Sequence, residues 1–494
     1  MTSRERVRER IASVDTAWLR MDRPCNLMQI IGVMIFAGRL DPERLKRTVA
    51  KRLLRYARFH QIAEQNSEGA WWVDDDDFDI DTHVRQSLLP SPCGKRELER
   101  FVAELASEPL NPSHPRWEYR LVETAEGDSA LVVRIHHAIA DGIALIGVLN
   151  SLTDASADAP EEGELKSPDR GHSFVDDETN EGDTLWNSIA EPITDLALAS
   201  IRIGGNLWGQ YQELRKAPGS IRDYASVARS LANEVKKLAL MPNDSATRFK
   251  GKPGTVKRVA WSEPIPLPQV KAVGRVLGCS VNDMLLSAVA GALRSYLLEQ
   301  GDSATDTEIR ALVPVNLRST DSNEQLGNHF GLVALELPVG IENPLTRLYT
   351  TRERMQALKG SYQAPVTYSL LGLVGMAPRF LQQQVLDLLS SKATAVMTNV
   401  PGPQQARYMA GVKLRQQMFW VPQSGSIGIG VSILSYDDQV QFGLITDKNM
   451  VDDPERIVNR FALEFERLLW LVLMEPWARL GNPAAVEAVM LDEI

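Results

Sequence analysis

Two adjacent histidines followed by an aspartate and a glycine are the residues of this chain best suited to chemistry. They lie in the segment His136-His137-Ala138-Ile139-Ala140-Asp141-Gly142. A neutral imidazole, with an ordinary pKa of about 6.5, can take a proton from an alcohol or an amine and later return one to a leaving group. Because the chain has only 7 histidines in 494 residues, this compact pattern is a strong signal for acid–base catalysis.

The residues around this segment predict how it is held. Residues 130–135 are apolar and β-branched, which favours a buried strand, and residues 142–152 favour an apolar helix. Successive strand side chains point to opposite faces, so only one of His136 and His137 can face a cavity. Gly142 would form the turn. The same geometry argues against a metal, since adjacent strand histidines do not converge on one ion.

The sequence has no recognisable serine or cysteine nucleophile near the histidines. The chain has no G-x-S-x-G motif and no cysteine near the histidines, which favours direct attack of an acceptor on a thioester over a covalent acyl-enzyme. Asp141 could orient the imidazole or pin the turn through an arginine. The alternative to catalysis is a buried histidine whose hydrogen bonds are all made within the core, beside an aspartate that caps the turn.

Length and composition limit the class of protein. At 494 residues with 44% hydrophobic residues, the chain can form two large domains or three small ones. Three scattered cysteines suit a reducing cytoplasm and provide no disulfide framework. We expect no signal peptide and no membrane-spanning segment, since no run of 18 apolar residues occurs. The net charge of −10 argues against nucleic acid as a partner.

Two charged segments follow the histidine motif. Residues 154–183 contain eleven acidic residues against two basic ones, which is typical of a solvated, mobile linker. Residues 215–258 reverse the balance, with eleven basic residues against three acidic ones. This basic block is either a solvated helix face with a basic loop or the electropositive mouth for an anionic substrate or phospholipid.

The pattern of strands and helices predicts two halves of mixed β/α structure. We expect an N-terminal domain at 1–153 with the histidine motif, an acidic linker at 154–184, crossover helices with the basic segment at 185–255, and a C-terminal domain at 256–494.

Several further motifs carry a resemblance. The histidine motif, read with Asn282-Asp283, the TNVPGP run at 398–403 and the PLNPSHPRWE run at 109–118, resembles the bacterial wax ester synthase/acyl-CoA:diacylglycerol acyltransferase family. The likeness spans nearly the whole chain and includes Asp15, Met28, residues 78–84, 314–318, 327–330 and 443–447. HHxxxDG alone would also fit chloramphenicol-acetyltransferase-like folds, plant acyltransferases and peptide-synthetase condensation domains.

The resemblance implies an α+β fold of two chloramphenicol-acetyltransferase-like domains, mixed sheets flanked by helices, joined by a helical crossover with an active-site tunnel between them. It makes His137 the general base beside His136, and Asp141 mainly architectural. It also implies that Asn282 stabilises the oxyanion, a task that suits a side-chain amide in a dry site. From the residues alone, Asn282 or Ser280 would equally well cap a helix.

The implied reaction moves a fatty acyl group from coenzyme A to a long-chain alcohol or diacylglycerol. Acyl-CoA is then a substrate, and no cofactor is expected. We expect substrate-binding roles for Asp283, Trp117, Lys250 and Lys252. We also expect a cytoplasmic protein associated peripherally with the inner membrane or with lipid inclusions. The alternatives are a carrier-protein-dependent condensation or acyltransferase enzyme and a non-catalytic lipid-binding protein.

The sequence departs from the family pattern at three positions. Gln29 follows Met28 where a histidine is usual, Asn111 replaces an aspartate and Arg116 replaces a leucine before the tryptophan of that motif. The long acidic insert is also unusual. These changes leave the base in place but leave the choice of acceptor open, on the hypothesis that they line the acyl or alcohol arm of the tunnel.

Overall fold

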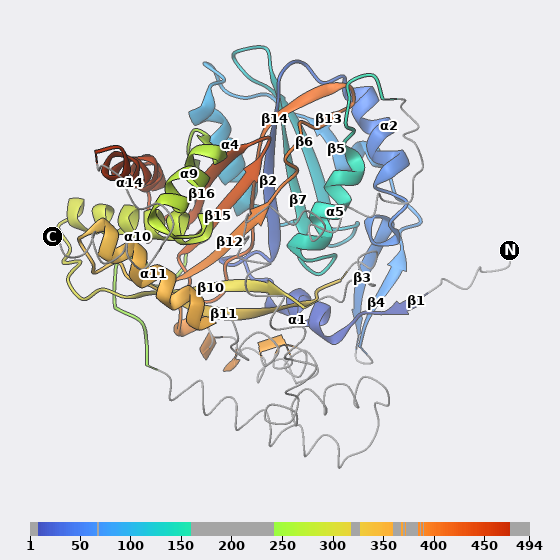
Figure 1. Ribbon diagram of the computed structural model, residues 1–494. Helices are drawn as coiled ribbons and strands as arrows, with labels where there is room; N and C mark the ends of the chain where they lie inside the picture. Colours follow the sequence, from blue (N-terminus) through green and yellow to red (C-terminus); the bar gives the residue numbers. More distant parts are fainter. Residues whose placement is uncertain are drawn as a thin grey trace, which may run out of the picture.

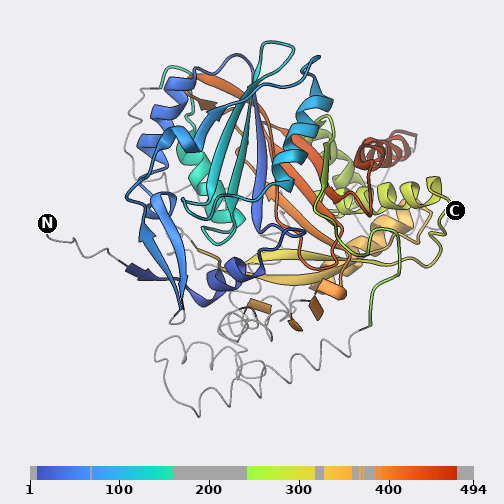
Figure 2. The same cartoon turned by 180° about the vertical axis from the view of Figure 1, so that it is seen from behind.

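Two large mixed β-sheets, each covered by helices, make up most of the molecule (Figures 1 and 2). The computed structural model describes residues 8–66, 69–159, 242–317, 327–358, 367–368, 371, 384–385, 387–388 and 390–474. A small antiparallel sheet of β1 (Arg8–Arg10), β4 (Gly69–Asp74) and β3 (Gln61–Asn66) adjoins the first large sheet. The arrangement confirms the α+β prediction. Most of the predicted linker and crossover, at 160–241, lies outside the described residues.

The first large sheet has the strand order β13-β14-β2-β7-β6-β5. Its central strands are β2 (Gln29–Phe36) and β7 (Ser129–His136), which pair antiparallel and are buried along their whole length. Their apolar, β-branched sequences are typical of strands covered on both faces. The other strands are β5 (Val84–Gln86), β6 (Trp117–Glu123), β13 (Tyr408–Met409) and β14 (Val412–Trp420).

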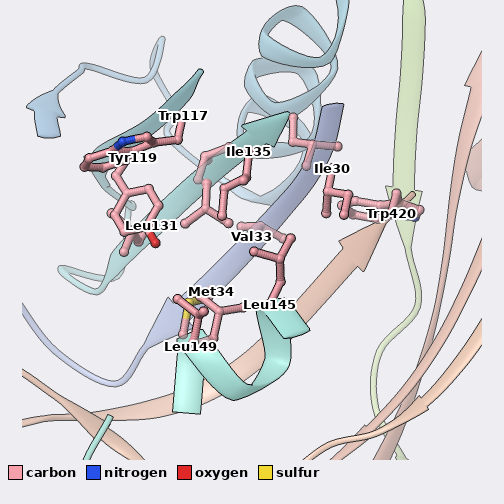
Figure 3. Close-up of a cluster of buried hydrophobic side chains, with 14 of the residues drawn as sticks. Ile30, Val33, Met34, Trp117, Tyr119, Leu131, Ile135, Leu145, Leu149 and Trp420 are labelled. Atoms are coloured by element: carbon pink, nitrogen blue, oxygen red, sulfur yellow. The ribbon is translucent and has the colours of Figure 1, made fainter. Parts of the chain in front are cut away.

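Helices cover the two faces of this first sheet. The face of β2 and β7 that carries Gln29, Arg134 and His136 packs against α4 (Lys95–Ser107), whose terminal carbonyls accept hydrogen bonds from Gln29 and Arg134. The opposite face, with Ile30 and Ile135, meets α5 (Gly142–Leu152) in an apolar cluster (Figure 3). The remaining helices of this half are α1 (Ser13–Met21), α2 (Pro42–Arg52), α3 (Ile80–His83) and the short 3₁₀ helix η1 (Ala57–His60).

The second large sheet has the order β11-β10-β12-β15-β16-β8, with β9 pairing to β16. Parallel pairing joins β10 to β12 and β12 to β15, and the other pairs are antiparallel. Its strands are β8 (Lys257–Trp261), β9 (Ile265–Pro266), β10 (Ile309–Asn316), β11 (Phe330–Leu337), β12 (Ala395–Pro401), β15 (Ile429–Tyr436) and β16 (Gln439–Asp447).

Four helices lie on one side of the second sheet (Figure 1). They are α9 (Leu267–Leu277), α10 (Val281–Glu299), α11 (Pro344–Leu358) and α14 (Pro454–Met474). Within the described ranges, no single helix is long and apolar enough to cross a membrane, although α9 and α10, bent by 97° at their junction, pass that test together. In the fold, most of α10 is buried between α11, α14 and the sheet.

Two strands of the first sheet, β13 and β14, come from the far end of the chain. β14 pairs antiparallel with β2, so residues 412–420 complete the sheet begun by residues 29–36. Gly32 of β2 makes this pairing close, because the Phe419 ring of β14 occupies the space where a Cβ would stand, 2.0 Å from its Cδ1 atom. The first sheet is therefore built by both halves of the sequence.

Candidate active site

The histidine motif sits on the turn between β7 and α5. Asp141 is the N-cap residue of α5: its Oδ1 accepts the Ala144 N–H at 3.0 Å, which satisfies a free donor of the first helical turn. Its Oδ2 accepts the His329 N–H at 2.9 Å. Asp141 thus fastens the motif to the segment leading into β11. This supports the architectural role that the resemblance implied.

Strand alternation decides which histidine faces the cavity. Val133, Ile135 and His137 line a pocket between the two large sheets, whereas His136 points to the other face of the sheet. His136 Nδ1 accepts the Ala138 N–H at 3.1 Å, and its Nε2 lies 3.5 Å from Asp22. His136 is therefore placed to support the turn, not to touch a molecule in the pocket.

His137 is held among aromatic rings. Its imidazole stacks on the Trp18 indole of α1, with ring centroids 4.2 Å apart and planes 19° from parallel, and the Phe330 ring lies 5.6 Å away. Its side chain is almost fully buried. Burial lowers the pKa of His137 to about 4, while the nearby charge of Asp141 acts in the opposite direction. The imidazole is consequently neutral at physiological pH, the form that a general base requires.

The pocket around His137 is large and apolar. It encloses about 1140 Å³, counting the open space at its mouth, which is at the upper end of ligand-binding pockets. β2, β7 and α5 form one wall, and β10, β11, β12, β15 and the end of β14 form the other. Among the described residues, the imidazole, carboxylate and hydroxyl side chains of its lining are His137, Asp141, Thr398, Ser424 and Ser432. The cavity therefore suits a long aliphatic group more than a polar one.

Asp15 and Asn328 form a buried link between α1 and the histidine motif. The Asn328 amide donates to Asp15 Oδ1 at 2.7 Å and to the His137 carbonyl at 2.8 Å, and the Asn328 N–H donates to the same Asp15 oxygen at 3.1 Å. Burial is the largest influence on Asp15 and raises its pKa to about 7. Both residues lie in segments that carried the resemblance, but pattern alone gave them no role.

Asn282 does not line the pocket. Thr398 of β12 faces the cavity, so the next residue, Asn399, points to the opposite face, where its amide donates to Asn282 Oδ1 on α10. The cap of α10 is Ser280, whose hydroxyl accepts the Asp283 N–H at 3.2 Å while the Asp283 carboxylate accepts the Ser280 N–H. The expected oxyanion contact of Asn282 and substrate contact of Asp283 are therefore replaced by structural ones.

Trp117 is a core residue. It lies one strand away from the pocket on β6, beside Tyr119 (Figure 3), and only 1% of it is exposed. Its indole N–H donates to the Phe59 carbonyl at 2.8 Å, and His83 stacks on it at 4.5 Å. Since every side of the ring is occupied by protein, the structure corrects the expectation that Trp117 binds substrate.

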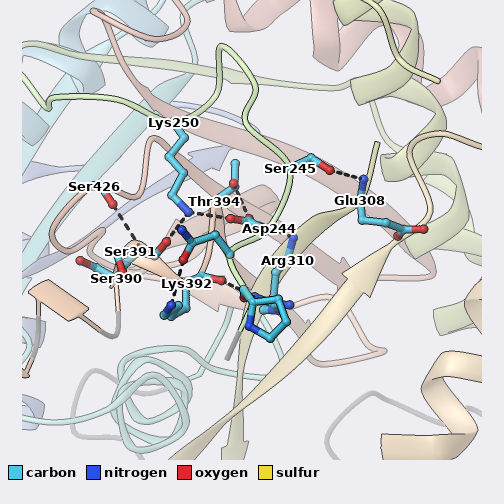
Figure 4. Close-up of polar contacts among 12 residues, drawn as sticks. Asp244, Ser245, Lys250, Glu308, Arg310, Ser390, Ser391, Lys392, Thr394 and Ser426 are labelled. Atoms are coloured by element: carbon cyan, nitrogen blue, oxygen red, sulfur yellow. Dashed lines mark hydrogen bonds and ion pairs between the residues drawn. The ribbon is translucent and has the colours of Figure 1, made fainter. Parts of the chain in front are cut away.

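The two lysines assigned to substrate also lie outside the pocket lining. Lys250 Nζ is 2.6 Å from the buried carboxylate of Asp244, in a polar cluster that also contains Arg310 and Ser391 (Figure 4). Its charge is thus compensated within the protein. Lys252 is exposed on the same connecting segment, next to Gly251, and its substrate role stays a prediction.

The departures from the family pattern lie away from the cavity as well. Gln29 Nε2 donates to the carbonyls of Leu105, Ala106 and Glu108 at the end of α4. Arg116 faces Asp22 at 3.5 Å, and Asn111 accepts the Ser113 N–H in a loop. None of the three lines the pocket. Their effect on acceptor choice stays a prediction.

Sequence reasoning missed two pocket residues that the structure makes prominent. Trp18 received no role from the sequence, although its spacing of three residues from Asp15 places both on one helical face. Phe419 belongs to a strand that was not predicted. Among the described residues, no group of three histidine, cysteine, aspartate or glutamate side chains could hold a metal ion.

Comparisons with known proteins match both halves of the chain to family models. A model of the wax ester synthase/diacylglycerol acyltransferase catalytic domain matches residues 11–285, and a model of the WS/DGAT C-terminal domain matches residues 326–469. A Mycobacterium tuberculosis protein named as a probable diacylglycerol O-acyltransferase is 27% identical over 437 residues, covering 87% of this chain and 88% of that protein.

Two solved structures share the fold. The wax ester synthase/diacylglycerol acyltransferase from Marinobacter aquaeolei VT8 superposes with a TM-score of 0.66 at 21% identity, covering 94% of this chain and 99% of that one. The starter condensation domain of rhizomide synthetase gives a TM-score of 0.54 at 13% identity, with 97% of each chain covered. Since the catalytic-domain model alone spans more than half of the sequence, this chain belongs to the wax ester synthase/diacylglycerol acyltransferase family.

Proposed function

We propose that this protein transfers a fatty acyl group from acyl-CoA to the hydroxyl of a long-chain alcohol or of diacylglycerol, forming wax ester or triacylglycerol. The observation that carries the proposal is a neutral, buried imidazole, His137, at the wall of a large apolar pocket between two sheets. Membership of the family supports acyl transfer, and the relative named above supports diacylglycerol as one acceptor.

The proposed mechanism uses one base and no covalent enzyme intermediate. The unprotonated ring nitrogen of His137 takes the proton of the acceptor hydroxyl as its oxygen attacks the thioester carbonyl. The tetrahedral intermediate collapses, the carbon–sulfur bond breaks, and the imidazolium returns the proton to the coenzyme A thiolate. The products are an ester and free coenzyme A.

The oxyanion needs a donor other than Asn282, which lies behind β12. Ser424 and Ser432 bring hydroxyls to the pocket wall, and Thr398 already donates to the Val431 carbonyl at 3.3 Å. Hydroxyl donors in a site without bulk water stabilise developing charge strongly. Ser432 is directly paired with Thr398 across β12 and β15, which makes this pair of strands the proposed oxyanion wall.

The apolar walls select the substrate class. Leu145, Leu149, Leu312 and Leu332 contribute only hydrocarbon surface, and each methylene buried there contributes roughly 0.8 kcal/mol. A chain of many methylenes therefore gains far more from this pocket than an acetyl group does. The same argument applies to an alcohol or diacylglycerol tail.

The test is thiol release from purified protein given palmitoyl-CoA with hexadecanol or dioleoylglycerol. We expect release with free acyl-CoA that depends on acceptor, and a loss of roughly 10²- to 10⁴-fold in His137→Ala. His136→Ala is the matched control, since it removes the neighbouring imidazole from the other face of the strand and should act through stability. Release only from carrier-protein-bound acyl groups would instead favour the condensation enzyme, and lipid binding without release the non-catalytic protein.

We also propose that the protein collects its acceptor at a lipid surface, since diacylglycerol and long alcohols reside in membranes and lipid inclusions. The last turns of α14 support this, because Trp470, Leu473 and Met474 are 60%, 64% and 77% exposed next to Arg467, a combination suited to an interface. Most of the basic block at 215–258, which the sequence offered as a phospholipid-binding segment, lies outside the described residues. Flotation with anionic vesicles tests this lipid-surface proposal. We expect the wild-type protein to float with the vesicles and the double variant Trp470→Glu/Leu473→Glu not to.

A further inference from the structure

The orientation of the Asn328 amide is fixed by its two acceptors. Its Nδ2 group donates to Asp15 Oδ1 at 2.7 Å and to the His137 carbonyl at 2.8 Å, and a primary amide has two hydrogens to donate. The nitrogen end is therefore fully used, and the oxygen end is free to accept. Asn328 is 3% exposed, so water does not readily reach that oxygen.

Two buried polar atoms of this cluster still need a hydrogen bond. Within the part of the chain that the structure describes, neither Asn328 Oδ1 nor His137 Nδ1 has a formed hydrogen bond. One is an acceptor, and the other is a donor when it carries the ring proton. The Asn328 side chain also interacts with the His137 ring and acts to raise its pKa, as does the carbonyl of His137 itself.

We propose that Asn328 is a positioning residue that keeps the His137 proton on Nδ1, so that Nε2 presents its lone pair to the substrate hydroxyl. In this arrangement Nδ1–H donates to Asn328 Oδ1 while Asn328 Nδ2 holds the His137 carbonyl. The inference rests on the proposed function, because it assigns the orientation of the general base.

Asp15 completes this arrangement. Its single Oδ1 atom accepts both the backbone N–H and the amide of Asn328, so it sets the direction in which Asn328 Oδ1 points. The chain of contacts runs from α1 through the segment before β11 to the histidine turn. An acceptor aligned on the far nitrogen is how a histidine base is commonly held in one tautomer.

The kinetic test compares wild type, Asn328→Ala and a swapped variant, Asp15→Asn/Asn328→Asp, in the thiol-release assay. Asn328→Ala should lower kcat roughly 10- to 100-fold with little change in KM, the usual effect of losing a partner that orients a histidine. The swapped variant keeps one carboxyl and one amide but puts the carboxylate beside the imidazole. Its acid limb should therefore move upward from about pH 4, because a neighbouring negative charge favours the imidazolium.

The control is Gln441→Ala, which removes another buried side-chain amide, one that donates to the Ser262 carbonyl at 3.3 Å on the far edge of the second sheet. It should lower the melting temperature without moving the acid limb. If Asn328→Ala behaves as Gln441→Ala does, with kcat preserved, Asn328 is only structural and the proposal fails.

A spectroscopic arm tests the tautomer without relying on activity. In protein labelled with ¹⁵N-histidine, with 7 histidines in the chain, the signals of His137 are identified by their loss in His137→Gln. We expect the Nδ1–H form in wild type and a mixture of tautomers in Asn328→Ala. A pure Nε2–H form in wild type would overturn the inference, and absence of thiol release alongside the expected tautomer would overturn the proposed function instead.

Discussion

The indole ring of Trp18 covers one face of the His137 imidazole, and the Phe330 ring tilts against both residues, 5.9 Å from Trp18 and 5.6 Å from His137. This contact joins the first helix of the chain to the base that the proposed reaction needs. It also removes water from one side of the imidazole, which is a direct cause of the low pKa of His137.

We expect Trp18→Ala to lower kcat roughly tenfold or more, because an imidazole that can tilt by about 1 Å loses its alignment with the acceptor hydroxyl. Trp72→Ala is the matched control: it removes a similarly buried indole, 3% exposed, that lies outside the pocket lining. Equal kcat values in the two folded variants would show that the stack has no catalytic consequence.

The acid side of the pH profile should be unusually low. Since burial brings the pKa of His137 to about 4, the imidazole is already neutral at pH 5.5. We expect kcat/KM to be flat from about pH 5.5 to 8 and to fall only as the pH approaches 4. A profile of kcat/KM in overlapping buffers, with folding checked by circular dichroism at each pH, measures this. An acid limb near pH 6.5 would place His137 in contact with bulk water.

Gly32 controls the space available to Phe419. A methyl group at Gly32 would clash with the Phe419 ring, so Gly32→Ala forces this pocket-lining ring to move. We expect a raised KM for palmitoyl-CoA in Gly32→Ala and a smaller effect with a short acyl-CoA. Adding Phe419→Ala should restore binding of the long chain. A double variant as impaired as Gly32→Ala alone would assign the defect to the β2–β14 pairing.

Asn282 and Asn399 should behave as one unit. They are buried and hydrogen-bonded to each other, so Asn282→Ala and Asn399→Ala should each lower the melting temperature and turnover by similar factors. The double variant should be little worse than either, with a coupling of roughly 0.5–3 kcal/mol. A direct oxyanion donor would give another result, a loss of about 10²- to 10³-fold in turnover for Asn282→Ala alone.

Asp15 makes stability depend on pH in an uncommon direction. Its pKa is about 7 in the folded protein because of burial, against 3.8 without it, so between these values the folded state holds a proton that the unfolded state has released. Stability from this group therefore falls as the pH rises from about 4 to 8. We expect the melting temperature of wild type relative to Asp15→Asn to decrease from pH 5 to pH 8.

Asp22→Asn provides the comparison for that measurement. Burial would raise the pKa of Asp22, but the hydrogen bond and charge of His136 outweigh it, so its pKa is lowered. The stability that Asp22 contributes is lost only at low pH, as its carboxylate is protonated. The difference in melting temperature between wild type and Asp22→Asn should stay constant between pH 5 and pH 8. A similar slope for both aspartate variants would contradict the assignment to Asp15.

Local pattern predicted much of the fold. The predicted strand at 130–135 and helix at 142–152 coincide with β7 and α5, because both are apolar runs with clear ends. The alternation along β7 correctly predicted that only one of the two histidines faces the cavity, and the resemblance identified that one as His137. These properties depend on neighbours in sequence, which a single sequence displays.

Contacts between segments far apart in the sequence could not be predicted from local patterns. β14 has polar residues at Lys413, Arg415, Gln416 and Gln417, so its strand character is weak until β2 is placed beside it. Trp117 and Asn282 were assigned to substrate or catalysis from motifs, but a motif cannot tell which face of a sheet a side chain occupies. Only the three-dimensional arrangement of β12 and α10 shows that Asn282 lies behind the pocket wall.

The pairing of β14 with β2 has a consequence for biosynthesis. While the chain is being made, β2 emerges early, and its apolar edge at residues 29–36 has no partner until residue 420 has left the ribosome. Unpaired strand edges are templates for association with other chains. The nascent N-terminal half therefore needs protection through most of translation, and a truncated chain ending before residue 412 would be prone to aggregate and would not fold into a separate domain.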